Sequence, residues 1–258
     1  MAMSAQTFPS LERRMKVTFL GTRGYITPKS NRHRMHTSTM VAYRGRKVMV
    51  DCGESWIGRI ADLKPRAIVI THPHPDHAFG LKAGSPCPVY ATAEAWKKMK
   101  KFPVQKEFRR VLQPRRPERI EGITFEAFPV VHSVRAPAVG YRISAGKVVL
   151  FYVPDVVQIS NLARVFSGIR AYIGDGATIT RPLIRHQKRN GQLIGHASIE
   201  TQLGWCRKER VPEMIVTHCG SAIVGGNKRY VQKKLQGLGH KYGVRVEIAH
   251  DGMELLLR

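Results

Sequence analysis

The sequence predicts a layered α/β protein, and three observations support this class. Short apolar runs rich in β-branched residues, such as residues 67–70 and 214–217, are typical of buried strands. Segments with helical spacing, such as residues 198–208, alternate with these runs. Several strands end at a histidine or an aspartate, and strand ends on one edge of a layered α/β protein gather into one crevice. We expect one domain over residues 1–258, with residues 1–14 as a loose leader.

The expected strands share short apolar or alternating patterns bounded by turn residues. They cover residues 16–20, 39–42, 47–51, 67–70, 88–91, 123–131, 140–143, 148–153, 172–173, 214–217, 244–249 and 253–257. The expected helices cover residues 56–63, a short stretch after Asp76, and residues 93–101, 198–208 and 230–238.

Two glycine-containing turns predict hairpins. Arg44-Gly45-Arg46 joins the second and third strands. Asp251-Gly252 is the strongest short hairpin signal in the chain and predicts that the last two strands pair with each other.

The net charge of +25, from 43 Lys+Arg against 18 Asp+Glu, predicts affinity for polyanions such as nucleic acid. A generally basic, solvated surface is the alternative. Residues 97–119 hold many of the cations and are broken by prolines, so part of this stretch should be loop. Residues 181–190 are also basic, and we expect them to be mobile.

The four cysteines have no CxxC spacing, which argues against a zinc ribbon and a disulfide framework and fits a reducing cytoplasm. The first residues lack the apolar segment of a signal peptide, and no apolar run is long enough to span a membrane. We therefore expect a cytoplasmic protein without a membrane partner, and a homodimer stays open.

The sequence THPHPDH, residues 71–77, follows the strand at 67–70 and is dense in metal ligands. Pro73 and Pro75 push His72 and His74 into extended conformations, so these two histidines should face the same way. Asp76 and His77 would then face a second metal. A polar surface loop is the alternative reading of this cluster.

Further candidate ligands stand where other apolar strands stop, and they are Asp51, His132, Asp155, Asp175 and His218. A single histidine after a strand is more often a capping or core residue than a ligand. Several such residues beside an HxHxDH loop favour a shared metal site.

HxHxDH, followed by a lone His, a lone Asp and a final His, resembles the metallo-β-lactamase superfamily. The resemblance implies a four-layer αββα sandwich with two divalent metals at the sheet edge. One metal would be held by His72, His74 and His132, the other by Asp76, His77 and His218, and Asp155 would bridge them. Asp51 matches an Asp that orients a ligand. Zinc is the expected metal, although manganese or iron accept the same ligands.

Within that superfamily, Asp155 stands where lactamases tend to use Cys, which resembles the phosphodiesterase and glyoxalase branches. Two further matches resemble ribonuclease Z and the related cyclic phosphodiesterases. IGDGAT, residues 173–178, resembles the HEAT segment of ribonuclease Z, with Asp175 in place of Glu. GHAS, residues 195–198, resembles its HST segment and aligns His196 with a histidine that assists at the phosphate. The tRNA-clamping arm of ribonuclease Z is missing here. Its absence argues against tRNA 3′ processing but leaves hydrolysis of other phosphodiesters open.

These features predict a dinuclear hydrolase, of phosphodiesterase or nuclease type, in which a metal-bridging hydroxide attacks phosphorus. Asp76 would orient or deprotonate the nucleophile, and His196 would donate a proton or hydrogen bond. A helix-start packing role is the alternative for His196. A small ester, lactone or thioester hydrolase and a nucleic-acid-binding protein with a structural metal are the competing functions.

Basic residues near aromatic ones are the candidates for contacting substrate phosphates, with a solvated basic face as the alternative. They are Arg109, Arg110, Arg115, Arg116, Arg181, Arg185, Lys188 and Arg189.

Overall fold

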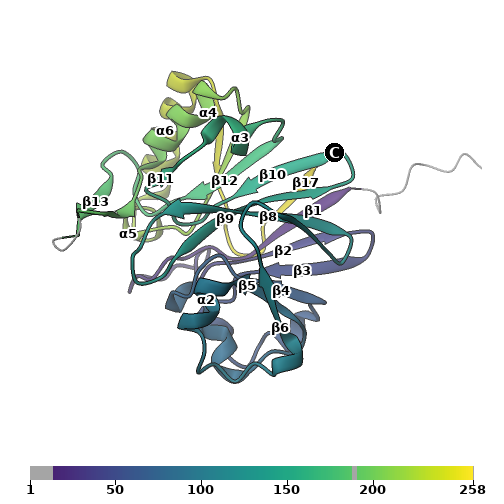
Figure 1. Ribbon diagram of the computed structural model, residues 1–258. Helices are drawn as coiled ribbons and strands as arrows, with labels where there is room; N and C mark the ends of the chain where they lie inside the picture. Colours follow the sequence, from purple (N-terminus) through teal and green to yellow (C-terminus); the bar gives the residue numbers. More distant parts are fainter. Residues whose placement is uncertain (1–13, 188–190, 258) are drawn as a thin grey trace, which may run out of the picture.

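The computed structural model describes residues 14–187 and 191–257, and two β-sheets packed face to face dominate it (Figure 1). Within these residues, the first sheet has seven strands in the order β17-β1-β2-β3-β4-β5-β6. They are β1 Met15–Gly21, β2 Ser38–Tyr43, β3 Arg46–Val50, β4 Ala67–Val69, β5 Val89–Thr92, β6 Arg109–Leu112 and β17 Glu254–Leu257. The strands β1, β2, β3 and β17 pair antiparallel, whereas β3 to β6 run parallel.

The second sheet has the order β11-β8-β9-β10-β12-β15-β16, and β7 pairs with β8. Its strands are β7 Pro117–Ile120, β8 Ile123–Val131, β9 Ala138–Ala145, β10 Val148–Tyr152, β11 Gln158–Ile159, β12 Ala171–Asp175, β15 Glu213–Thr217 and β16 Arg245–Ile248. A separate hairpin is formed by β13 Leu183–His186 and β14 Leu193–His196.

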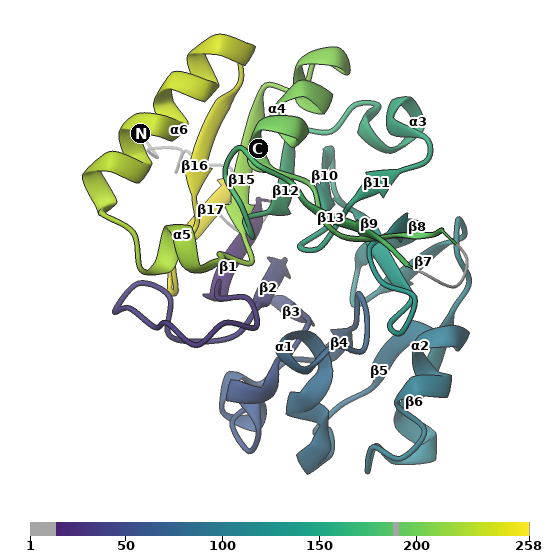
Figure 2. The same ribbon diagram turned by 90° about the vertical axis from the view of Figure 1, so that its left-hand side faces the viewer.

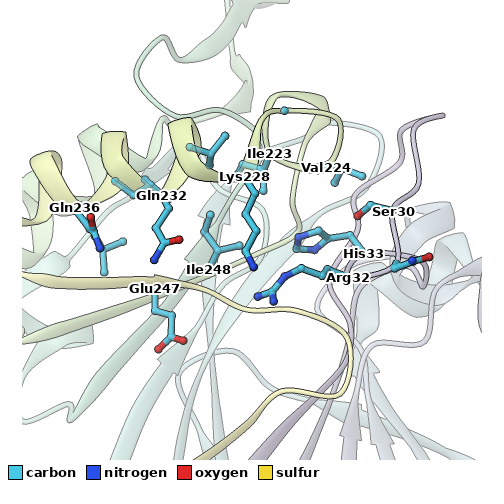
Figure 3. A pocket seen from close by; sticks show the side chains of 15 residues that line it. Ser30, Arg32, His33, Ile223, Val224, Lys228, Gln232, Gln236, Glu247 and Ile248 are labelled. Carbon is cyan, nitrogen blue, oxygen red and sulfur yellow. The ribbon is translucent and has the colours of Figure 1, made fainter.

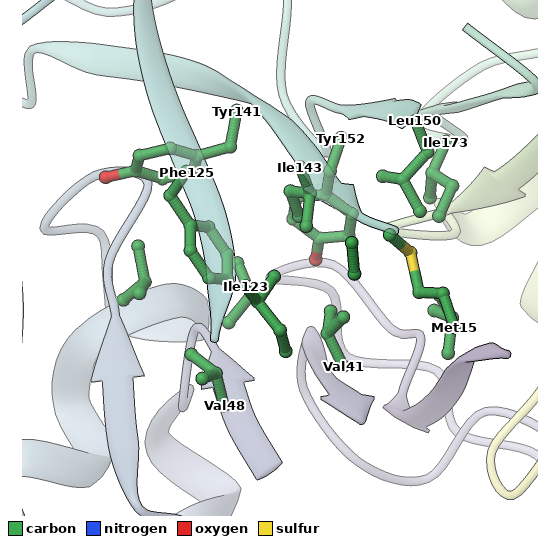
Figure 4. Packing of buried hydrophobic residues seen from close by; sticks show 14 of the residues in the cluster. Met15, Val41, Val48, Ile123, Phe125, Tyr141, Ile143, Leu150, Tyr152 and Ile173 are labelled. Atoms are coloured by element: carbon green, nitrogen blue, oxygen red, sulfur yellow. The ribbon is translucent and has the colours of Figure 1, made fainter. Parts of the chain in front are cut away.

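A core of inward-facing side chains joins the two sheets (Figure 4). Val41 and Val48 come from the first sheet, and Phe125, Tyr141 and Leu150 come from the second. All five are buried, as expected for alternate residues of strands that present one face to a partner sheet.

Helices cover the outer faces of both sheets, which completes the αββα sandwich (Figures 1 and 2). The two longest helices, α4 Ile199–Lys208 and α6 Lys228–Tyr242, lie on the second sheet together with the short helix α3 Leu162–Phe166. The first sheet is covered by α2 Ala93–Lys98 and by short helical turns. The remaining short elements are α1 Pro75–Ala78, α5 Ser221–Val224, η2 Glu54–Trp56, η3 Ala61–Leu63, η4 Phe79–Ala83 and η5 Lys106–Phe108. No helix among the described residues is long and apolar enough to cross a membrane.

The predicted pairing of the last two strands is wrong. β16 pairs with β15 in the second sheet, whereas β17 pairs with β1 in the first. Asp251-Gly252 does form a turn, but this turn carries the chain from one sheet to the other. The Asp251 carboxylate accepts hydrogen bonds from the backbone nitrogens of Thr22, Arg34 and Met35, so long-range partners determine where the chain goes next.

Residues 56–63 do not form one amphipathic helix, because Gly58 adopts a φ of +73° between the one-turn helices η2 and η3. Part of the proline-broken stretch 97–119 is loop, as expected, and the stretch also contains β6 and the start of β7. The basic stretch 181–190 contains β13, whose backbone pairs with β14; residues 188–190 lie outside the described residues. The Arg44-Gly45 turn does join β2 to β3, and both residues have positive φ.

Candidate metal centre

The THPHPDH loop leaves β4 and enters the short helix α1. His74 precedes Pro75 and is extended, with φ −76° and ψ 160°. Pro75 occupies the first turn of α1, where its missing N–H is not needed. This local geometry holds His72 and His74 ahead of the helix, while Asp76 and His77 lie within it.

Three histidines form the first group of ligand atoms. His72 Nε2 lies 3.0 Å from His74 Nδ1, and His132 Nε2 lies 3.3 Å from the same atom. His132 comes from the end of β8 in the second sheet, so this group joins the two halves of the sandwich. These three atoms are close enough to share one metal ion.

Asp76, His77 and His218 form the second group. His218 Nε2 lies 2.9 Å from Asp76 Oδ2, and His77 Nε2 lies 3.5 Å from the same oxygen. His218 follows β15 and has a φ of 50°, a left-handed conformation that is uncommon for a residue with a side chain. Such strained conformations persist only where the surrounding structure maintains them, and they are frequent at functional sites.

Asp155 lies between the two groups. Its Oδ2 is 2.7 Å from His77 Nε2 and 3.9 Å from His72 Nε2. Its Oδ1 is 3.3 Å from His218 Nε2 and 3.6 Å from His132 Nε2. A carboxylate with each oxygen facing both groups has the geometry expected of a bridging ligand.

The outer nitrogens of the histidines are held by other protein groups, which turns the inner nitrogens toward the centre. His132 Nδ1 lies 2.9 Å from the Gly195 carbonyl, and His72 Nδ1 lies 3.0 Å from Thr71 Oγ1. His77 Nδ1 lies 2.8 Å from Asp51 Oδ2.

Asp51 also accepts hydrogen bonds from the Thr71 backbone and hydroxyl, at 2.8 and 2.7 Å. It follows β3 with a φ of 60°, which turns its carboxylate toward the THPHPDH loop. Gly53 is required at the turn that follows, because a Cβ there would lie 2.2 Å from the Asp76 carbonyl oxygen. Asp51 therefore supports two residues of the loop without belonging to either ligand group.

Asp175 holds His196 through a 2.8 Å contact between Oδ2 and Nδ1. The same carboxylate accepts backbone hydrogen bonds from Val156 and Ala177. Asp175 thus reaches His196 even though it is one carbon shorter than glutamate. Ser198, and not His196, caps α4, because the Ser198 side chain accepts a hydrogen bond from the Thr201 backbone nitrogen.

The electrostatics of the cluster favour a bound cation. Burial lowers the pKa of His77 and of His218, but the neighbouring aspartates outweigh burial and raise both, that of His218 to about 10. Burial raises the pKa of Asp155, yet His218 and His77 outweigh it and leave the pKa well below its usual value. His72 and His132 lie farther from the carboxylates, so burial lowers their pKa values and keeps them neutral.

Three buried polar atoms of the cluster have no hydrogen-bond partner among the described residues, namely His77 Nε2, Asp155 Oδ2 and His218 Nδ1. The 2.7 Å contact between the first two is thus close but not aligned as a hydrogen bond. Unsatisfied buried groups are costly, and His77 Nε2 and Asp155 Oδ2, which face each other across the centre, fit a metal ion better than each other. His218 Nδ1 instead faces Asp175 Oδ1, at 3.6 Å. The donor set, imidazole nitrogens with carboxylate oxygens, suits zinc and similar ions.

A family model described as the beta-lactamase superfamily domain matches residues 46–219, a range that includes all of these cluster residues. The chain belongs to the beta-lactamase superfamily. A ribonuclease Z from Methanococcus maripaludis is 30% identical over 155 residues, covering 49% of this chain and 48% of that protein. A ribonuclease Z from Alkaliphilus oremlandii is 42% identical over 74 residues, covering 26% of this chain and 22% of that protein. The matches therefore span about half or less of the length of these superfamily relatives.

Solved structures agree with the superfamily fold. The metallo-beta-lactamase fold protein YhfI from Bacillus subtilis superposes with a TM-score of 0.69 at 18% identity, covering 95% of this chain and 99% of that one. A diphosphatase from the PhnP family superposes with a TM-score of 0.66 at 19% identity, covering 95% of this chain and 97% of that one. The short form of human tRNase Z superposes with a TM-score of 0.60 at 18% identity, covering 94% of this chain and 99% of that one. The αββα expectation is confirmed.

The basic residues predicted to contact substrate phosphates do not gather around one point, in contrast to the candidate metal ligands. Arg109 on β6 donates to the carbonyls of Val104 and Phe102 and lies over the Trp96 ring, so its guanidinium braces its own loop. Arg110 donates to the Glu107 carbonyl. The other candidates in the described residues are exposed, and they are Arg115 and Arg116 before β7 and Arg181 and Arg185 at β13. Lys188 and Arg189 lie outside the described residues.

Sequence reasoning missed two supporting residues. Gln202 on α4 accepts from the Asp175 backbone nitrogen at 2.9 Å and donates to the Asp175 carbonyl at 2.8 Å. Thr71 links Asp51 to His72. Thr71 begins the THPHPDH segment and could have been noticed, whereas Gln202 carries no local signal because it faces Asp175 only after α4 packs on the second sheet.

Proposed function

We propose that this superfamily member is a dinuclear, metal-dependent hydrolase of phosphodiesters, of nuclease or phosphodiesterase type. The position of Asp155, facing both histidine groups with its two oxygens, carries the dinuclear part of the proposal. The phosphodiester part is supported by the Asp175–His196 contact beside that centre and by relatives named ribonuclease Z.

The proposed ligands are those of the two groups. His72, His74 and His132 would hold one divalent ion, Asp76, His77 and His218 the other, and Asp155 both. When bound, such a pair of ions supplies Lewis acidity and a nucleophile at neutral pH. Zinc is our first choice for both sites, because histidine nitrogen and carboxylate oxygen are among its common ligands.

We assign Asp76 to handling the proton of the nucleophile. Its contacts with His77 and His218 are made through Oδ2, which leaves Oδ1 for that role. Helix α1 and the Gly53 turn fix its backbone, so the carboxylate is already in place before substrate arrives.

We assign His196 to the phosphate or the leaving oxygen. Its Nδ1 faces Asp175, which turns Nε2 away from that carboxylate and toward a substrate. Burial lowers the pKa of His196, but Asp175 and Asp155 outweigh burial and raise it, which favours the protonated form of the ring. A protonated imidazole beside the metal ligands can donate to a developing negative charge.

Metal analysis of the purified protein, followed by parallel hydrolysis assays, tests the proposal. The substrates are RNA, single-stranded DNA, a cyclic nucleotide and a lactone. We expect about two ions per chain and metal-dependent turnover of at least one phosphodiester. Turnover of the lactone alone would favour the small-ester alternative, and bound metal without turnover of any substrate would favour a structural metal.

A further inference from the structure

A cavity of about 440 Å³ lies between α6, β16 and the loop at residues 30–33 (Figure 3). The turn after α5 closes one side. None of the cluster's histidines or aspartates lines it. Cavities of about 300 to 1,000 Å³ are typical of small-molecule sites, so the size suits one small ligand.

Two cations define one end of this cavity. Arg32 comes from the loop and Lys228 from the start of α6, and Figure 3 shows their charged ends pointing toward one another. Neither side chain forms an ion pair with a carboxylate in the described part of the chain. Glu247 lines the cavity through its strand, but Figure 3 shows its carboxylate pointing away from it. Both side chains are exposed, and because two like charges directed at one space repel each other, a bound anion between them would be favoured.

The rest of the cavity offers an apolar surface and amides. Val231 and Leu235 on α6 and Val246 and Ile248 on β16 provide aliphatic side chains. Figure 3 shows the amide of Gln232 pointing from α6 toward β16. Amides offer both donors and acceptors, which suits the polar edge of a heteroaromatic ring.

We propose that this cavity is a second ligand site, which binds a nucleoside monophosphate or a closely similar organic phosphate. The phosphate would lie between Arg32 and Lys228, the flat ring would pack on the aliphatic surface, and Gln232 would contact the ring edge. Arginine and lysine are the usual phosphate-binding side chains. The site is separate from the metal centre, and this proposal does not depend on the hydrolase activity.

Calorimetric titration with AMP tests the site, because AMP carries both chemical features. The double variant Arg32→Ala/Lys228→Ala should weaken binding by at least about tenfold, since it removes charge-assisted hydrogen bonds. Gln232→Trp, which fills the cavity without changing charge, should weaken it too. Lys233→Ala removes an exposed cation elsewhere on α6 and should leave binding unchanged.

Adenosine, which lacks the phosphate, should bind at least about tenfold more weakly than AMP. Thermal melts of each variant would show that the fold is intact. Wild-type affinity in the double variant would place AMP at the metal centre or elsewhere and overturn the proposal. Equal weakening by Lys233→Ala, or no AMP binding to the wild-type protein, would overturn it as well.

Discussion

The two sheets contribute to the metal centre in different ways. The first sheet supplies four candidate ligands from one seven-residue loop, THPHPDH, with Asp51 behind it. The second sheet supplies His132, Asp155 and His218 near the ends of three separate strands, and the separate β13–β14 hairpin adds His196. The first contribution is local and compact, whereas the second exists only when β8, β10 and β15 end at the same edge and the hairpin lies beside them. The THPHPDH loop can therefore be recognised from the sequence alone. The remaining ligands and His196, which complete the centre, come together only in the folded chain.

Removing the charge of Asp155 should have the largest effect, because this residue joins the two groups. We expect Asp155→Asn to reduce turnover to background and to lower the metal content, since no other carboxylate faces both groups among the described residues. Elemental analysis and a phosphodiester assay measure both quantities. Asp62→Asn, at an exposed aspartate, is the matched control. Full metal content and turnover in Asp155→Asn would contradict the bridging role.

His196→Ala should affect turnover but not metal content. A general acid or hydrogen-bond donor contributes about 10²- to 10⁴-fold, so we expect a loss of that size. The control is His186→Ala, an exposed histidine on the neighbouring strand of the same hairpin. Unchanged turnover in His196→Ala would remove this residue from the mechanism, and a parallel loss of metal would make it a ligand instead.

Asp51→Asn tests the support behind the first-sheet loop. It removes the carboxylate that orients His77 and contacts Thr71, and outer partners of this kind are worth about 10- to 100-fold in metal affinity or activity. Competition with a chelator measures the affinity. Thr71→Val removes the hydroxyl contacts with Asp51 and His72 but keeps the contact between Asp51 and His77, so it should give a smaller effect. If Asp51→Asn resisted the chelator as well as the wild-type protein, Asp51 would not be needed to orient His77 and the THPHPDH loop.

The basic residues should give the smallest effects and should differ between the two regions. Arg181→Ala/Arg185→Ala, on the hairpin that leads to His196, should lower the salt dependence of single-stranded RNA binding by about 0.7 per lost phosphate contact. Arg109→Ala/Arg110→Ala should leave that slope unchanged and lower the melting temperature, because these side chains brace their own loop. The reverse pattern would place the substrate on the edge of the first sheet.

Much of the fold followed from local patterns. β8 begins and ends at the predicted residues, and the ends of β10 and β15 fall within a residue of prediction. The last two strands were the main failure, because the Asp251-Gly252 signal describes a turn and carries no information about which sheet each strand joins. The short helices η2 and η3 failed for a local reason, since amphipathic spacing did not show the left-handed backbone of Gly58.

The superfamily resemblance, the ligand-rich THPHPDH loop and the residues that stand at strand ends can all be recognised in the amino-acid sequence. These depend on residue types and short spacings, which are present in the chain before it folds. The folded chain was needed to show that Asp155 faces both groups, that Asp175 contacts His196 and that the Arg109 guanidinium binds carbonyls of its own loop. Those facts depend on strands that are distant in sequence ending at one edge, and on hydrogen bonds whose partners no local pattern specifies.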